Sequence, residues 1–207
     1  MFSSFFDFVQ ETNDYYFPPL VGNYFRLLRV LMMPLTLVIT PLWYLLVNDP
    51  GIYQSSWRFL AVKEPLDVPL LVQLLLVEFF VDLLKLASLN TPDMLSNSLS
   101  VVGGLILGDF AVRIGWFCSD VILYMSIVAI AAFTQQSYEL GYAFKFTRIL
   151  SLIATAVFGV WGYLGVMLAF TLFIAFNKTV GGRGYLYPLI PFNGKALFLT
   201  FFRPRRK

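Results

Sequence analysis

The sequence has no histidine and a single cysteine, Cys118. Because histidine and cysteine supply most zinc ligands and paired cysteines supply disulfides, the sequence predicts no metal site, no disulfide framework and no thiol-histidine catalysis. Cys118 is read as a small buried hydrophobe. The GGRG at residues 181–184 lacks the GK[ST] ending and the preceding strand of a phosphate-binding loop. The sequence therefore indicates a protein that is not an enzyme and has no cofactor.

Charged residues are also scarce. They make up 13% of the 207 residues, whereas hydrophobic residues make up 58%, and the mean hydropathy is +0.74. A soluble domain of this length could not hide several long uncharged runs in one core. Composition therefore predicts an all-α integral membrane protein with a single transmembrane domain over residues 1–207.

Apolar runs divide the predicted domain into a bundle of about four spans. The runs long enough to cross a bilayer are residues 25–47, 68–86, 120–138 and 149–176. Residues 99–115 are shorter and rich in glycine, so they are expected to form a re-entrant segment or a short fifth span. Residues 1–24 are rich in aromatics and lack basic side chains, which is typical of an interfacial leader.

Basic residues concentrate at the C-terminal end. Seven of the fifteen Lys and Arg residues lie within residues 177–207, although the formal net charge of the whole chain is only +3. Cytoplasmic segments next to membrane spans carry an excess of Lys and Arg, and Arg26 with Arg29 precedes the first span. We therefore expect a basic cytoplasmic tail, both termini in the cytoplasm and no nucleic-acid partner.

Five ionisable residues lie inside the apolar sequence. Glu78, Asp82 and Lys85 fall within about 60° of one another at ~100° per residue, so they form one polar stripe on a helix. Asp109 and Arg113 repeat the i, i+4 spacing. A bare charge at the bilayer centre costs at least ~2.5 to 3.5 kcal/mol, so such residues face a partner or water. Two interpretations remain open: ion pairs, Glu78 or Asp82 with Lys85 and Asp109 with Arg113, or the lining of an ion or solute path.

Two glycine clusters predict close contact between helices. Gly104 and Gly108 form a GxxxG motif next to Gly103, and three further glycines recur at three-residue spacing at Gly159, Gly162 and Gly165. Small residues on one face let two backbones approach closely. Packing of helices is the main interpretation, and a backbone-lined filter at the GxxxG motif is the alternative.

Several motifs in order resemble the membrane domain of the GerA-type spore germination receptor A subunits. They are EFFVDLLKLASLNTP from Glu78, SLSVVGGLILGDFAV from Ser98 followed by GW, SYELGYAFKFTRIL from Ser137, and GRGYLYPLIPF from Gly182. The resemblance extends from about residue 14 to residue 191.

The resemblance implies a subunit of the spore inner membrane that oligomerises around a central pore and takes part in ion release during germination. Its implied partners are further copies of the chain, other germination membrane subunits and membrane lipids. Glu78 and Asp82 stand where the family has a pair of acidic residues, and Lys85 stands where it has an arginine.

The chain also departs from the family pattern. Leu86 replaces an acidic residue, and Asp109 stands where the wider family more often has glutamine. Family members carry a soluble cytoplasmic domain before the segment that resembles the start of this chain. We therefore expect either a fragment or a short paralogue that cannot receive the signal which that domain transmits.

Two functions follow from these observations. The first is a pore-forming ion channel subunit, which the excess of acidic over basic membrane residues favours: Glu78, Asp82, Asp109 and Asp120 against Lys85 and Arg113. The second is a non-conducting structural or accessory subunit that stabilises a germination complex.

Overall fold

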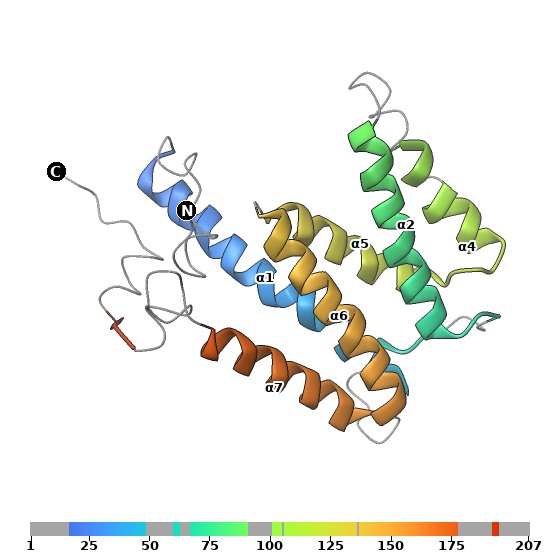
Figure 1. Cartoon of the computed structure of the whole chain (residues 1–207). Coiled ribbons are helices and arrows are strands. Elements are labelled where there is room, and N and C mark those ends of the chain that lie inside the picture. The colour runs from blue at the N-terminus through green and yellow to red at the C-terminus, as the bar shows by residue number, and fades with distance from the viewer. Residues whose placement is uncertain are drawn as a thin grey trace.

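Helices form nearly all the regular structure in the part of the chain that the structure describes. The computed structural model describes residues 17–48, 60–62, 67–90, 101–104, 106–135, 137–177 and 192–194. Its elements are α1 (Pro19–Asn48), α2 (Leu70–Asn90), η4 (Ile106–Phe110), α4 (Ala111–Arg113), α5 (Ser119–Phe133), α6 (Tyr138–Phe158) and α7 (Val160–Phe176) (Figure 1). The predicted all-α class is confirmed for these residues. Most of the leader and nearly all of the basic tail lie outside them.

Four helices lie along one common direction. In Figure 1, α1 and α6 run one way while α5 and α7 run the other, and α6 packs against both α1 and α7. Helix α2 crosses this set and contacts α5 and α6. Residues 101–104 lie beside α2, since a Cβ on Gly103 would collide with the Leu84 side chain. After α1 the chain thus leaves the four-helix set through α2, and it rejoins the set at the start of α5.

A buried glutamine joins the start of α2 to the start of α5. The Gln73 side chain is buried and donates from Nε2 to the Val68 carbonyl (2.8 Å), while its Oε1 accepts from the Cys118 backbone N–H (2.9 Å). The amide therefore satisfies a backbone donor at the start of α5 and joins it to the start of α2. Cys118 is itself buried in the surrounding core, as predicted. The core cluster consists of Trp43, Leu70, Leu74, Val77, Phe117, Cys118, Val121, Met125 and Leu152.

The long apolar run at residues 149–176 is not one helix. Helix α6 begins after Ser137, whose Oγ accepts from the Leu140 N–H (3.3 Å), and it ends at Phe158. Gly159 has φ 59°, a left-handed conformation that favours glycine, and α7 begins at the next residue. Residues 149–176 therefore do not form one continuous helix, because the chain turns at Gly159 and α7 packs against α6. A single crossing by these residues stays a prediction.

The segment predicted to be re-entrant is irregular. Residues 101–104 are helical, η4 is a π-helix and α4 is three residues long. Gly115 has φ 86° and turns the chain toward α5. A π-helix interrupts regular α-helical hydrogen bonding, so this segment does not form one straight rod.

Length and hydropathy limit which helices can cross a bilayer alone. Leu20–Asn48 and Glu139–Phe158 are long and apolar enough to do so. Helices α5 and α7 are apolar but have 15 and 17 residues. Relative to the predicted spans, residues 25–47 lie within α1, α2 covers 68–86 from Leu70 onward, and α5 ends at Phe133 rather than 138. The number of full crossings stays a prediction.

Candidate functional site: a charge cluster beside a cavity

Glu78 on α2 is buried and holds a cation from α6. Arg148 Nη2 lies 2.5 Å from Glu78 Oε1, and Arg148 Nε donates to the same oxygen at 2.6 Å. Both side chains are about 95% shielded from solvent. Charged hydrogen bonds of this length in a buried place are strong, and removing one partner would leave the other without compensation.

Lys145 lies between the two carboxylates of α2. Its ammonium forms an ion pair with Asp82 Oδ2 and lies 3.8 Å from Glu78 Oε2. It also donates to the Glu78 backbone carbonyl at 3.4 Å. Because Lys145 and Arg148 are three residues apart on α6, they present both cations to Glu78 and Asp82, which are four residues apart on α2.

The cluster extends to α1 and to the turn between α5 and α6. Arg148 Nη1 donates to the Thr36 carbonyl at 2.8 Å, and Gln135 Nε2 donates to Thr36 Oγ1 at 3.3 Å. The carbonyl of Thr36 is free to accept a side-chain donor in addition to its own helical bond. The charge cluster therefore joins α1, α2, α6 and the α5–α6 turn.

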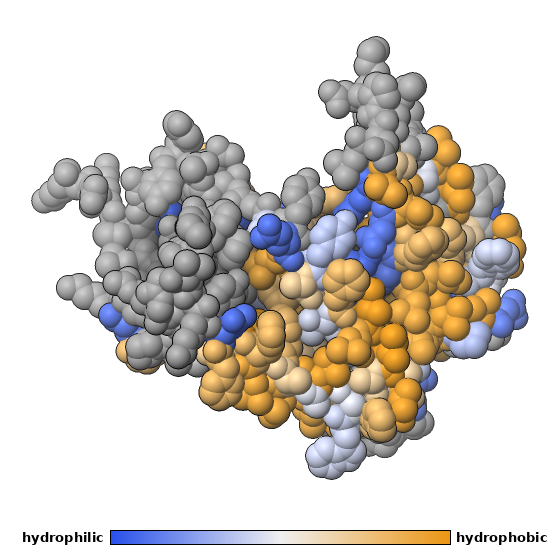
Figure 2. Space-filling view, in the orientation of Figure 1, coloured by the Kyte–Doolittle hydropathy of each residue, from blue (hydrophilic) through white to orange (hydrophobic). Residues whose placement is uncertain are grey.

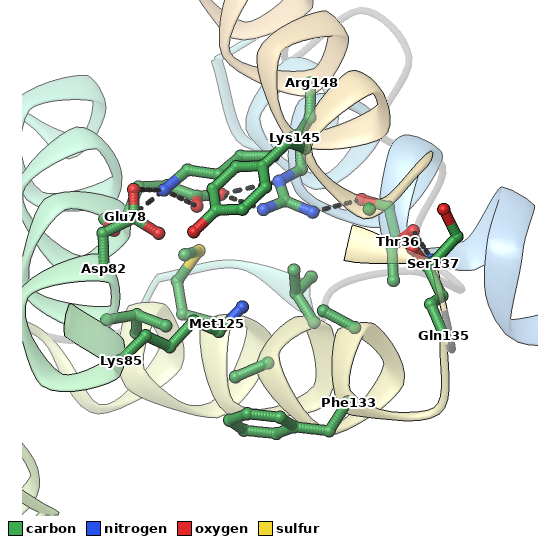
Figure 3. Close-up of a pocket in the computed structure, with 16 residues that line it drawn as sticks. Thr36, Glu78, Asp82, Lys85, Met125, Phe133, Gln135, Ser137, Lys145 and Arg148 are labelled. Carbon is green, nitrogen blue, oxygen red and sulfur yellow. Dashed lines mark hydrogen bonds and ion pairs between the residues drawn. The ribbon is translucent and has the colours of Figure 1, made fainter. Parts of the chain in front are cut away.

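A cavity of about 500 Å³ lies beside this cluster (Figure 3). Its apolar wall comes from α5 and consists of Met125, Val128, Ala129, Ala132 and Phe133. Its charged wall consists of Glu78, Asp82, Lys85, Lys145 and Arg148. Thr36, Gln135, Ser137 and Tyr142 add hydroxyl and amide groups. The volume falls within the ~300–1,000 Å³ of ordinary small-molecule pockets.

The cavity-lining residues Asp82 and Lys85 on α2 are less buried than Glu78. The Asp82 side chain is 37% exposed, whereas that of Glu78 is 4% exposed. In Figure 3, Lys85 extends along α5, and its ammonium lies 5.2 Å from the centroid of the Phe133 ring. Such a cation–π contact is worth roughly 0.5–1 kcal/mol at an exposed site.

Asp109 and Arg113 form the expected i, i+4 pair outside the cavity. Arg113 Nε lies 2.7 Å from Asp109 Oδ1, and the two side chains are 73% and 47% exposed. Neither lines the cavity. The structure therefore separates this pair from Glu78, Asp82 and Lys85, and a pore-lining role for it stays a prediction.

The glycines differ in how closely other atoms approach them. A Cβ on Gly162 would overlap the Ala154 backbone carbonyl of α6, and one on Gly103 would overlap only the flexible Leu84 side chain. At Gly104, Gly108, Gly159 and Gly165 no atom of the described residues lies within 4 Å of such a Cβ. Another backbone therefore comes close at Gly162, and a helix-packing role for the glycines stays a prediction.

Sequence reasoning missed the partners that α6 supplies. For Glu78 and Asp82 it considered only Lys85 as a partner, whereas the sequence also has Lys145 and Arg148 in the segment that leads into a long uncharged run. Two cations at i, i+3 on one membrane helix are complementary to two carboxylates at i, i+4 on another. This complementarity of charge and spacing could have predicted the ion pairs between the two helices.

Comparison with known proteins identifies relatives over nearly the whole chain. Stage V sporulation protein AF of Bacillus subtilis (strain 168) is 32% identical over 203 residues, which cover 97% of this chain and 41% of that protein. Spore germination protein A1 of the same organism is 27% identical, with coverages of 87% and 38%. The Bacillus subtilis protein named Uncharacterized membrane protein YfkQ is 23% identical, with coverages of 78% and 32%.

The chain spans about two fifths of the length of the first of these relatives. No solved structure matches it. The order of motifs from EFFVDLLKLASLNTP to GRGYLYPLIPF predicts a GerA-type protein, and residues 3–207 match the family described as Bacillus/Clostridium GerA spore germination protein. The chain therefore belongs to the GerA family of spore germination proteins.

Proposed function

We propose that this chain is a subunit of an oligomeric ion channel or germinant receptor-like complex in the spore inner membrane, and that it mediates ion release during germination. The relatives are named as spore germination and sporulation proteins, which supports the germination role. The observation that carries the proposal is the charge cluster, which places five ionisable side chains around one cavity between apolar helices. Ionisable residues in such surroundings are expensive, and they mark ion or substrate pathways in membrane proteins.

We infer different roles for the two acidic residues of the cluster. Glu78 is buried and held by Arg148, so it joins α2 to α6. Asp82 lines the cavity, its side chain is less buried than that of Glu78, and it shares Lys145 with Glu78. We therefore place Asp82, not Glu78, on the side of the cluster that an ion would meet.

The outer surface of the helices suits lipid or neighbouring subunits. Gly162 is the one buried residue of α7, and Trp161 on the same helix is 82% exposed. A helix that is apolar on all sides and covered on only one by its own chain needs an apolar environment on the others. This supports placing the bundle in the membrane and leaves surface for association.

A non-conducting accessory subunit is the second candidate, and the charge balance favours it. The sequence predicted an excess of acidic residues along an ion path. Among the residues that the structure describes, the cavity lining instead combines two carboxylates with three cations, Lys85, Lys145 and Arg148. A lining without an excess of negative charge does not attract cations, so a conducting path for cations would need either rearrangement of the cluster or a separate route between subunits.

We propose that both termini face the cytoplasm. In the alternating arrangement of α1, α5, α6 and α7, the α5–α6 turn lies at the end of the set toward which the start of α1 points (Figure 1). Lys145 then lies in the cytoplasmic half of α6 and Arg148 at the middle of that helix. Helix α2 and residues 101–113 enter and leave from the opposite side.

Accessibility tags test this orientation. Tags at residue 207, before Arg26 and within residues 134–137 should all report the cytoplasm, while a tag near Gln54 should report the opposite side. A tag in the α5–α6 turn that reports the outer side would contradict the alternating arrangement, and one at residue 207 that does so would contradict an even number of crossings.

Ion flux tests the conducting role. Liposomes that contain the purified chain, with and without candidate partner subunits, should release a loaded monovalent cation faster than empty ones. Asp82→Asn should change the rate or the ion preference, because the amide keeps the shape and removes the charge. Asp109→Asn, at an exposed pair outside the cavity, is the matched control. Flux in no subunit combination would favour the accessory role.

A further inference from the structure

The charged side chains around the cavity already have partners within the chain. Glu78 pairs with Arg148, and their side chains are 4% and 5% exposed. Asp82 pairs with Lys145. Lys85 lies 5.2 Å from the centroid of an aromatic ring and has a further interaction within the chain. A charged ligand would have to compete with these contacts and give up its own hydration, which is costly between apolar helices. The lining therefore favours an occupant without net charge.

The wall that α5 contributes is apolar and includes small side chains. Val128, Ala129 and Ala132 line it, and the two alanines are only half-buried. Buried water needs several polar partners, which these three side chains do not offer. An apolar cavity of about 150 Å³ is already large enough for benzene, and this cavity measures about 500 Å³. Its α5 side therefore suits an apolar molecule at least as large as one ring.

Three lining residues favour an aromatic ring over a saturated chain. Met125 and Phe133 lie on α5, and Tyr142 lies on α6. In Figure 3, Met125 projects from α5 toward the charged residues, and Phe133 lies farther along the same helix. Aromatic rings attract one another in offset and edge-to-face arrangements, and the methionine sulfur makes favourable contacts with ring edges. A ring between α5 and α6 thus gains contacts that a saturated chain lacks.

The surroundings of the cavity suit the entry of an uncharged compound. Phe133 lines the cavity and is also exposed, so the α5 wall continues onto the outer surface. Figure 2 shows a mainly hydrophobic surface around α2, with a smaller hydrophilic patch beside that helix. An uncharged aromatic compound enters apolar surroundings with a gain in free energy, whereas a charged one pays a penalty there.

We propose that the cavity is a binding site for an uncharged aromatic small molecule. The ring lies against Ala129 and Ala132 on α5. It also contacts Val81 on α2 and Tyr142 on α6, which line the same cavity. Because the molecule contacts three helices together, it stabilises the arrangement in which they enclose it. The inference goes beyond ion release, and it requires neither conduction nor assembly with other subunits.

Photolabelling of the full chain in nanodiscs tests the proposal, with trifluoromethyl-phenyl-diazirine as an uncharged aromatic probe. Mass spectrometry of the peptides measures the label at each position. Tyr142 lines the cavity, whereas Tyr163 on α7 is a tyrosine outside it. The wild type should carry more label at Tyr142 than at Tyr163. An excess of trifluoromethylbenzene, which has no diazirine, should remove the label at Tyr142 only, because a site saturates and partition into lipid does not.

Variants that fill the cavity locate the site. Ala129→Phe places a ring in the cavity and changes no charge, so the label that trifluoromethylbenzene removes from Tyr142 should be lost. Ser126→Phe adds the same side chain at an exposed position of α5 outside the cavity, and it should keep that label. Ala132→Leu is a smaller filling variant that should reduce the label, and it serves where Ala129→Phe fails to fold.

Two results would overturn the site. One is a label at Tyr142 that excess trifluoromethylbenzene does not remove, or removes equally at Tyr163, since the probe then only partitions into lipid. The other is an equal fall in Ala129→Phe and Ser126→Phe, which would place the probe elsewhere on α5. The first result is available from the wild type alone, even if no filling variant folds. Because labelling is measured without ion flux, its outcome is independent of the flux experiment.

Discussion

Glu78→Gln is expected to lower the free energy of unfolding by about 3 to 5 kcal/mol, the loss typical of breaking one side of a buried ion pair. The amide keeps the shape of the side chain but leaves Arg148 buried without its carboxylate, 2.5 Å from the changed group. Lys145 also loses one of its two carboxylate neighbours. Unfolding of the purified chain by increasing mole fractions of denaturing detergent measures the change.

A compensating substitution separates loss of the pair from loss of the side chain. Arg148→Met in the Glu78→Gln background should restore most of the stability, because no buried charge then lacks a partner. Asp109→Asn is the control at an exposed pair and should change stability by only about 0–1 kcal/mol. Wild-type stability of Glu78→Gln, or rescue by Lys85→Met but not by Arg148→Met, would show that the α2–α6 pair does not hold the bundle together.

Gly162→Leu is expected to separate α6 from α7. Even the first side-chain carbon would overlap the Ala154 carbonyl, which is backbone and cannot rotate away. Overpacking of a well-packed place costs about 1–3 kcal/mol, and a collision with backbone belongs at or above the upper end of that range. The expected result is a lower yield of folded protein and faster proteolysis near the α6–α7 connection.

Gly165→Leu provides the matched control for that experiment. It lies one turn farther along α7, adds the same side chain, and meets no atom within 4 Å at its Cβ. Gly165→Leu should therefore leave stability within about 0.5 kcal/mol, as surface substitutions do. If it is as disruptive as Gly162→Leu, the face of α7 at Gly165 contacts another subunit, and the glycine spacing has a role between chains.

Composition and periodicity were sufficient for the helical class, but only some of the predicted boundaries lie within two residues of a helix end, such as the start of α5 and the end of α7. The break within the uncharged run at residues 149–176 could not be predicted in this way, because hydropathy is averaged over a window and contains no information about the backbone angle φ. A single glycine at φ 59° ends α6, and the neighbouring sequence has equally apolar residues on both sides. Gly159, Gly162 and Gly165 share one spacing, yet one bounds a turn, one meets backbone and one faces open space. Only the three-dimensional arrangement distinguishes them.

The candidate site was half predictable for a similar reason. Glu78, Asp82 and Lys85 were identified because helical periodicity brings them onto one face of one segment. The ion-pair partners of Glu78 and Asp82 on α6, Lys145 and Arg148, are more than 60 residues away in sequence, and pairing at such separation depends on how helices pack. The reversal at Gln135 to Ser137, which brings the start of α6 against α2, creates both the pairs and the cavity.

The left-handed turn at Gly159 also has a consequence for how the chain inserts into the membrane. A membrane insertion system responds mainly to hydrophobicity, and the 28 residues from 149 to 176 could enter the bilayer as one tilted rod. If α6 and α7 cross separately, they enter instead as a paired hairpin that returns the chain to the side from which it came. The conformation of one residue then decides whether the number of crossings is odd or even, and so in which compartment the seven basic residues that follow are located.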